Sequence, residues 1–180
     1  MARRPRDTTP GIHHVVMGAT GEEDYFLDDS DRSTWIRRLV RTLDRFGWTC
    51  ITVCELTTHA HALLDIPDAS ISRGMHYLNS FYGTYFNEKN ERRGALVRSR
   101  FWSKRVVDDE QLLAAFRYIA RNPVRAGLCV RPEDWLWSGF ATSCGLARTF
   151  SFVDASVVLA TLGATPANAA HLLRALVRDD

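Results

Sequence analysis

The feature that most constrains the fold is the alternation of two hydrophobic periods along the chain. Short apolar or alternating stretches, typical of strands, are followed by longer stretches with an apolar residue every three or four positions, typical of helices. The stretches that predict strands are residues 12–17, 48–56, 59–66 and 96–107. Those that predict helices follow caps at residues 28–31, Ser70 and Asp108, and they end at Gly47, residues 87–94 and Pro123.

The resulting order is β-α-β-β-α-β-α, in which residues 96–107 form a last strand or an extended arm. This is the order of the split βαβ, ferredoxin-like arrangement with one helix added. We therefore expect an α+β fold whose antiparallel sheet carries helices on one face. Short helices at 155–162 and 166–177 are expected to follow, separated by Gly163. The chain thus divides into a domain at residues 1–140 and a helical extension at residues 141–180.

Composition excludes several classes of protein. Of the 180 residues, 46% are hydrophobic and 24% charged, which is the balance of a globular chain. No apolar run approaches the eighteen or so residues of a membrane span, and no signal segment follows the start. We expect a cytoplasmic protein without membrane contact. The four cysteines fit no zinc pattern and are expected to be reduced packing residues.

Positive charge is concentrated between Lys89 and Arg125, although the whole chain carries only +2. This segment holds ten Lys and Arg residues against four acidic residues, which gives a net charge of +6. Such an excess suits a polyphosphate partner, because phosphate neutralisation dominates affinity for nucleic acids. An ordinary solvated surface accounts for the same charge equally well.

Two histidines share one face of the strand expected at residues 59–66. Period-two alternation places His59 and His61 on one side and the apolar Ala60, Ala62 and Leu64 on the other. Neutral imidazoles side by side can share a divalent metal. A half-exposed polar surface is the alternative interpretation of the pair.

The third helix presents Tyr118 and Asn122 one turn apart, on a face beside its buried stripe. Tyr118 can offer its hydroxyl to a site, and the amide oxygen of Asn122 could reach the same metal. Alternatively, Tyr118 packs as a half-buried amphipathic ring and Asn122 is only a helix-end residue before Pro123. The rival tyrosines Tyr25, Tyr77, Tyr82 and Tyr85 have no Asn one turn later.

Residues 101–128 form a long segment that ends in the element Tyr-Ile-x-x-Asn-Pro-Val-Arg-Ala-Gly. This segment resembles the signature of a known family, the HUH-superfamily single-tyrosine transposases of the insertion-sequence 200 type, especially their REP-associated branch. Further matching segments, in the family's order and at similar spacing, are residues 26–29, 43–48, 59–64, 72–75 and 131–138.

The resemblance implies roles for four residues. The family's metal-binding histidine pair falls on His59 and His61, its nucleophile on Tyr118 and its amide ligand on Asn122. Such an enzyme binds Mg²⁺ or Mn²⁺ and cuts single-stranded DNA through a 5′-phosphotyrosine, which a 3′-hydroxyl can later attack to transfer the strand. Hairpin or palindromic repeat DNA is the implied substrate. The family includes both monomers and dimers, so a homodimer stays open.

Two departures from the family pattern concern the rim of this site. Leu56-Thr57-Thr58 stands where the family usually has Met-Pro-Asn or Met-Pro-Asp, and Met17-Gly18-Ala19 stands in place of Arg-Gly-Asn. Both affect substrate choice more than chemistry. Basic residues interleaved with aromatic ones are the candidates for gripping single-stranded DNA. They are Arg98, Arg100, Phe101, Trp102, Lys104, Arg105, Arg121 and Arg125.

Two other functions are weighed against a DNA transposase and endonuclease. A domesticated protein could grip hairpin DNA or RNA without cutting, although a pure binder has no chemical reason to keep His59, His61, Tyr118 and Asn122 together. A metal-independent phosphoesterase with paired His-x-Ser/Thr motifs is excluded, because no histidine of the chain has Ser or Thr two residues later.

Overall fold

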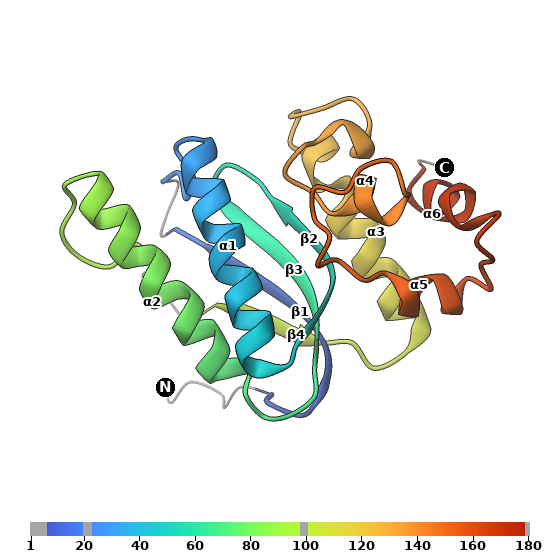
Figure 1. Ribbon diagram of the computed structural model, residues 1–180, viewed down its shortest axis with the longest axis horizontal. Coiled ribbons are helices and arrows are strands. Elements are labelled where there is room, and N and C mark those ends of the chain that lie inside the picture. Colours follow the sequence, from blue (N-terminus) through green and yellow to red (C-terminus); the bar gives the residue numbers. More distant parts are fainter. Residues whose placement is uncertain (1–6, 20–22, 98–100, 179–180) are drawn as a thin grey trace.

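A four-stranded antiparallel sheet forms the centre of the molecule. The computed structural model describes residues 7–19, 23–97 and 101–178 (Figure 1). The strands are β1 (Gly11–Gly18), β2 (Thr49–Glu55), β3 (His59–Ile66) and β4 (Trp102–Arg105), in the spatial order β2-β3-β1-β4. This order confirms the ferredoxin-like prediction. Within the described part of residues 96–107, predicted to form a last strand or an extended arm, Trp102–Arg105 pair with β1 as β4.

The first face of the sheet is covered by the long helices α1 (Asp29–Phe46) and α2 (Ile71–Lys89), which lie side by side (Figure 1). Alternate residues of β1 and β3 point toward these helices, including Val15, Met17, Ala60 and Ala62, and all are buried in one hydrophobic core. The intervening residues of the same strands therefore point to the opposite face.

Helix α1 begins and ends where its caps predict. The side chain of Asp28 accepts hydrogen bonds from the backbone N–H groups of Ser30 and Asp31, and Gly47 ends the helix with a φ of 66°. Helix α2 has Ser70 at its N-cap position, as predicted, but the Ser70 side chain makes no capping hydrogen bond. The Ser70 hydroxyl instead accepts a 2.8 Å hydrogen bond from the indole of Trp48.

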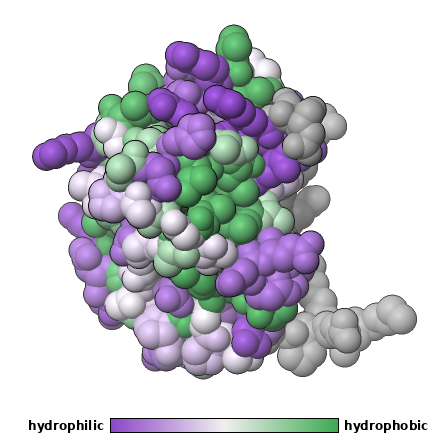
Figure 2. All heavy atoms as spheres, turned by 90° about the vertical axis from the view of Figure 1, so that its right-hand side faces the viewer, coloured by the Kyte–Doolittle hydropathy of each residue, from purple (hydrophilic) through white to green (hydrophobic). Residues whose placement is uncertain are grey.

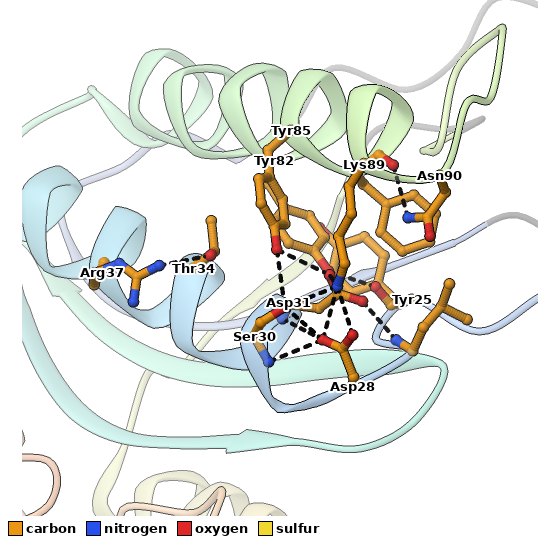
Figure 3. A network of polar contacts seen from close by, with 12 residues as sticks. Tyr25, Asp28, Ser30, Asp31, Thr34, Arg37, Tyr82, Tyr85, Lys89 and Asn90 are labelled. Atoms are coloured by element: carbon orange, nitrogen blue, oxygen red, sulfur yellow. Dashed lines mark hydrogen bonds and ion pairs between the residues drawn. The ribbon is translucent and has the colours of Figure 1, made fainter.

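A polar cluster ties the start of α1 to the end of α2 (Figure 3). The Lys89 ammonium donates to Asp28 and Ser30 and to the fully buried Asp31, at 2.7–2.8 Å. Burial works against the charge, but the hydrogen bonds to Asp28 and Asp31 raise the pKa of Lys89. Because these contacts join elements about sixty residues apart in sequence, they fix the relative position of the two helices.

The second face of the sheet is covered by α3 (Asp109–Arg125) and by the C-terminal segments. The side chain of Asp108 caps α3, as predicted. The prediction that Pro123 ends this helix is wrong, because Pro123 lies inside its last turn. A proline there forfeits one backbone hydrogen bond, and the chain turns only at Gly127, whose φ is 70°.

The C-terminal part contains a 3-10 turn and three short helices. They are η1 (Pro132–Asp134), α4 (Phe140–Ser143), α5 (Ser156–Thr161) and α6 (Ala169–Val177). The buried residues of α4, α5 and α6 join those of α3, β2 and β3 in a second core. Figure 2 shows this side of the molecule, where hydrophobic residues gather near the middle and hydrophilic residues surround them. Among the described residues, no helix has the length and apolar character that crossing a membrane requires.

Candidate active site

Three histidines meet on the second face of the sheet. His59 and His61 lie two residues apart on β3 with ring centroids 4.8 Å apart, and His14 of β1 lies 5.2 Å from His61. The pairing of β1 with β3 causes this proximity, since Val16 lies directly opposite His61 and His14 is its neighbour on the same face. His61 is only 3% exposed, because α3 covers this part of the sheet.

Each histidine of the predicted pair is held through its Nδ1 atom. A 2.9 Å hydrogen bond joins His61 Nδ1 to His14 Nε2, and another of 2.9 Å joins His59 Nδ1 to Thr58 Oγ1. Metal-binding imidazoles in proteins are usually oriented in this way, with one nitrogen anchored and the other left for the metal. The Nε2 atom of His61 is buried and has no hydrogen-bond partner.

All three imidazoles are disposed to stay neutral. Burial, together with His59 and His14, lowers the pKa of His61 to about 3. Burial and the nearby Lys104 lower the pKa of His14 to about 4, and burial also lowers the pKa of His59. A neutral imidazole keeps a lone pair on one nitrogen, which is the form that binds a metal.

Gly18 leaves space for His59 at the edge of the site. It lies opposite His59 in the β1–β3 pair, and a Cβ atom at this position would come within 2.8 Å of His59 Cβ. Any other residue at position 18 would therefore displace His59. The glycine of the family pattern is thus explained by packing, although its neighbours here differ.

Tyr118 reaches this site from α3. Its ring centroid lies 5.5 Å from that of His61 and 5.8 Å from that of His14, and the residue is 40% exposed. The guanidinium of Arg125, two turns farther along α3, lies 5.4 Å from the centre of the Tyr118 ring. The phenol is therefore held between an imidazole cluster and a cation while one side stays open to solvent.

Two hollows open beside Tyr118. The first, of about 750 Å³, is lined by His14, His59, His61 and Tyr118 together with Trp102, Lys104 and Arg105. The second, of about 560 Å³, is lined by Tyr118 with Arg117, Arg121 and Arg125 of the same helix. Five of the eight residues predicted to grip DNA therefore line the hollows around the candidate nucleophile. They are Trp102, Lys104, Arg105, Arg121 and Arg125.

The other predicted site residues are placed differently. Phe101 is 8% exposed and packs in the first core, and it lines neither hollow. Asn122 is buried one turn beyond Tyr118, with an unpaired side-chain nitrogen, and it is not among the residues that line the first hollow. Arg98 and Arg100 lie outside the described residues.

His14 is the residue that sequence reasoning did not place in the site. The signal was present, because a ferredoxin-like order puts the first strand beside the strand that carries His59 and His61, and alternation puts His14 on their face. Gln111 also lines the first hollow, with its amide donating a 2.9 Å hydrogen bond to the Asp108 carboxylate.

The model of the family described as "Transposase IS200 like" matches residues 10–122, which is more than half of the chain and includes every residue of the histidine cluster and Tyr118. The chain belongs to the IS200-like transposase family. The match begins before β1 and ends in the last turn of α3. The matched region therefore contains the whole sheet, the helices α1 and α2, and most of α3.

Two related proteins resemble this transposase-family chain. A candidate REP-associated tyrosine transposase of Haemophilus influenzae is 25% identical over 111 residues, which cover 56% of this chain and 63% of the relative. The matched part thus spans less than two thirds of that relative's length. A solved REP-associated tyrosine transposase bound to a REP hairpin has a TM-score of 0.70 at 16% identity, covering 87% of this chain and 94% of the other. The second likeness shows the shared fold.

Proposed function

We propose that the chain is a metal-dependent single-stranded DNA endonuclease and strand transferase that uses Tyr118 as its nucleophile. The observation that carries the proposal is the contact of Tyr118 with His61, which is one of two neighbouring imidazoles whose Nδ1 atoms are already anchored. Membership of the IS200-like transposases supports the reaction class. The solved relative with this fold is bound to a REP hairpin, and we propose hairpin DNA as the substrate here.

The residues present fit a divalent metal at His59 and His61. The buried Nε2 of His61 has no partner, and such an orphaned nitrogen is costly unless something binds it. Asn122 is the proposed amide ligand, and its unpaired buried nitrogen shows that its own hydrogen bonding is incomplete. Among the described residues no third His, Cys, Asp or Glu completes a ligand set, so amide, water and phosphate oxygens would supply the other positions.

The tautomers of the two histidines follow from this assignment. For Nε2 of His61 to bind a metal, its Nδ1–H must donate to His14 Nε2, and His14 must then carry its own proton on Nδ1. For His59, the Nδ1–H donates to the Thr58 hydroxyl in the same way. Bound Mg²⁺ or Mn²⁺ would polarise the scissile phosphate and stabilise the charge that grows on it.

Tyr118 supplies the covalent step. Its phenol loses a proton, and the oxygen attacks phosphorus while the bond to the 3′ oxygen breaks and that oxygen gains a proton. The products are a 5′-phosphotyrosine and a free 3′-hydroxyl. The phosphoester bond is conserved, so a second 3′-hydroxyl can attack the phosphotyrosine and transfer the strand. Tyr118 is released by this second step.

The cationic side chains around Tyr118 would hold the DNA strand at the site. Lys104 and Arg105 line the hollow on the histidine side, and Arg121 and Arg125 line the hollow on the other side of the tyrosine. Phosphate contacts from both hollows would place one phosphodiester next to the phenol. Trp102 is 51% exposed beside His14 and offers a ring on which an unpaired base can stack.

The test is to incubate the purified chain with a pool of labelled single-stranded hairpin oligonucleotides, with Mn²⁺ or with EDTA. We expect a protein-DNA band that survives denaturation, only with Mn²⁺. A non-cleaving hairpin-binding protein would retain the DNA on a native gel and give no covalent band under either condition. That result would refute the proposed reaction while leaving the family and fold in place.

A further inference from the structure

A second basic surface lies on the side of the molecule opposite to Tyr118. A groove of about 610 Å³ runs between α1 and α2, the two helices that cover the first face of the sheet (Figure 1). Its lining includes Arg38, Arg45 and Arg73 together with Tyr77 and Phe81, and it contains no acidic residue. The site described above lies on the other face, so this groove is separate from it.

The cations in this groove are stacked on aromatic rings. The guanidinium carbon of Arg38 lies 3.6 Å from the centre of the Tyr77 ring and 4.1 Å from that of Phe81. The guanidinium carbon of Arg45 lies 4.9 Å from the centre of the Tyr77 ring. The Nε–H of Arg38 also donates a 3.4 Å hydrogen bond to the Tyr77 carbonyl. The terminal N–H groups of planar guanidiniums held in this way are well matched to phosphate oxygens.

The positive charge of this surface is not balanced from within the described residues. Arg38, Arg41 and Arg45 form no ion pair with a described carboxylate, and Arg73 reaches the exposed Asp68 only at 3.9 Å. Burial and the neighbouring Arg41 and Arg45 lower the pKa of Arg38, although Tyr77 works in the opposite direction. Crowded like charges of this kind become favourable when an anion lies among them.

We propose that the groove between α1 and α2 binds an unpaired segment of the same DNA that the opposite face cuts, with phosphates on Arg38 and Arg45 and a base against Phe81. Phe81 is 39% exposed, so part of its ring is open to a base beside the Arg38 guanidinium. The combination of a positive groove with aromatic rings is the usual means of holding single strands. A duplex offers phosphates but no unpaired base for the ring.

This proposal rests on the proposed function, because that function identifies the bound polymer as DNA. Its test measures binding and does not depend on cleavage. Binding of a fluorescein-labelled twenty-nucleotide oligo(dT) to the full chain is measured by fluorescence anisotropy in EDTA at several salt concentrations. We expect Arg38→Ala/Arg45→Ala to bind at least about fivefold more weakly. Loss of two phosphate contacts should also reduce the slope of log affinity against log salt by about 1.4.

Two single substitutions separate stacking from charge. Phe81→Leu keeps the apolar character and removes the ring, and we expect it to weaken oligo(dT) binding about fivefold. Arg38→Lys keeps the charge and loses the planar group, so binding should recover only in part. The matched control is Arg131→Ala/Arg148→Ala, which removes two exposed charges from the C-terminal side and should leave affinity within about twofold.

Specific results would overturn the proposal. Equal affinity of the wild type and Arg38→Ala/Arg45→Ala, with both melting at the same temperature, would show that single strands do not use this groove. An unchanged affinity in Phe81→Leu, with inorganic polyphosphate competing as well as oligo(dT), would show a site for polyanions in general. Failure of the proposed function gives a different result, namely no covalent hairpin adduct in the wild type.

Discussion

His14 enters the site through sheet pairing and not through a motif. Its Nε2 atom lies 2.9 Å from His61 Nδ1, and in the tautomers proposed above it accepts the Nδ1–H of His61 and so leaves His61 Nε2 to the metal. The residue is therefore a positioning residue and not a member of the proposed ligand set. Burial lowers the pKa of both histidines, which removes the repulsion that two charged imidazoles at this distance would cause.

Replacing His14 by Ala should weaken Mn²⁺ binding by about 10- to 100-fold, because the orientation of His61 is lost while both proposed histidine ligands remain. Mn²⁺ titration followed by electron paramagnetic resonance measures this directly, without DNA. His76→Ala is the matched control, since His76 is an exposed histidine on α2. Unchanged Mn²⁺ affinity in His14→Ala would remove His14 from the site.

Glu55 is a second residue whose environment has a measurable consequence. It is fully buried at the end of β2 and neither of its carboxylate oxygens has a hydrogen-bond partner. Burial raises the pKa of Glu55 well above its usual value of 4.5, and the nearby Arg32 offsets this only in part. A raised pKa in the folded state means that the stabilising contribution is complete below pH 4.5 and declines as the pH rises.

Glu55→Gln should therefore change the pH dependence of the free energy of unfolding. The wild type should lose at least about 1 kcal/mol relative to the variant between pH 5 and pH 8, because each unit of pKa shift corresponds to about 1.4 kcal/mol. Urea unfolding at a series of pH values measures the difference. Glu88→Gln, which changes an exposed carboxylate, serves as the control. Parallel pH profiles for the wild type and Glu55→Gln would contradict the account.

At the scale of elements, the sequence predicted most boundaries, and the exceptions can be traced to particular residues. The caps at Asp28 and Asp108 and the stop at Gly47 are confirmed, because each depends on the residue's own side chain or backbone. The Ser70 hydroxyl makes no capping hydrogen bond to α2. It accepts a hydrogen bond from the indole of Trp48 instead, which is distant in sequence. Pro123 does not end α3, because the helix continues to Arg125 despite the backbone hydrogen bond that the proline removes. Contacts from elsewhere in the fold cannot be read from a local pattern.

Helix α2 contains two glycines that should respond in opposite ways. A Cβ at Gly74 would lie 2.1 Å from the Trp48 ring, which is buried and held by its bond to Ser70, whereas a Cβ at Gly83 meets nothing within 4 Å. Gly74→Ala should destabilise the protein by about 1–3 kcal/mol, despite the better helix propensity of alanine. Gly83→Ala should instead add up to about 1 kcal/mol.

Chemical denaturation of the two variants decides this prediction. The packing of α2 on Trp48 would be incorrect if Gly74→Ala matched Gly83→Ala in stability. The comparison uses the same substitution in one helix, so differences in intrinsic helix propensity cancel.

At the scale of the molecule, the sheet separates two layers with different tasks. The α1 and α2 layer is fixed by the Lys89 cluster and carries the arginine and aromatic groove, while the other face carries the histidines and α3. The order of elements predicted the sheet, and alternation predicted the shared face of His59 and His61. The packing of residues 141–180 on α3 and the proximity of His14 depend on tertiary contacts, which no local period encodes.

The two faces of the sheet also separate the residues of β4 and its start that were predicted to contact DNA. Trp102 and Lys104 lie two residues apart on β4 and therefore on the same face, and both line the hollow beside the histidines. Phe101, one residue earlier, points into the opposite core. A sequence that interleaves basic and aromatic residues does not reveal which of them face solvent until the strand's register is known.

The proposed mechanism requires Tyr118 to become covalently linked to DNA. The most direct measurement compares covalent adduct formation by the wild type and Tyr118→Phe with labelled hairpin DNA and Mn²⁺. The substitution removes one oxygen from a residue that is 40% exposed, so stability and hairpin binding should stay within about twofold of the wild type. Tyr85→Phe, which removes a phenol on α2, should still form the adduct. We expect no adduct and no cleavage for Tyr118→Phe. Cleavage at the wild-type rate would refute the proposed covalent step, because water or another residue would then be the nucleophile.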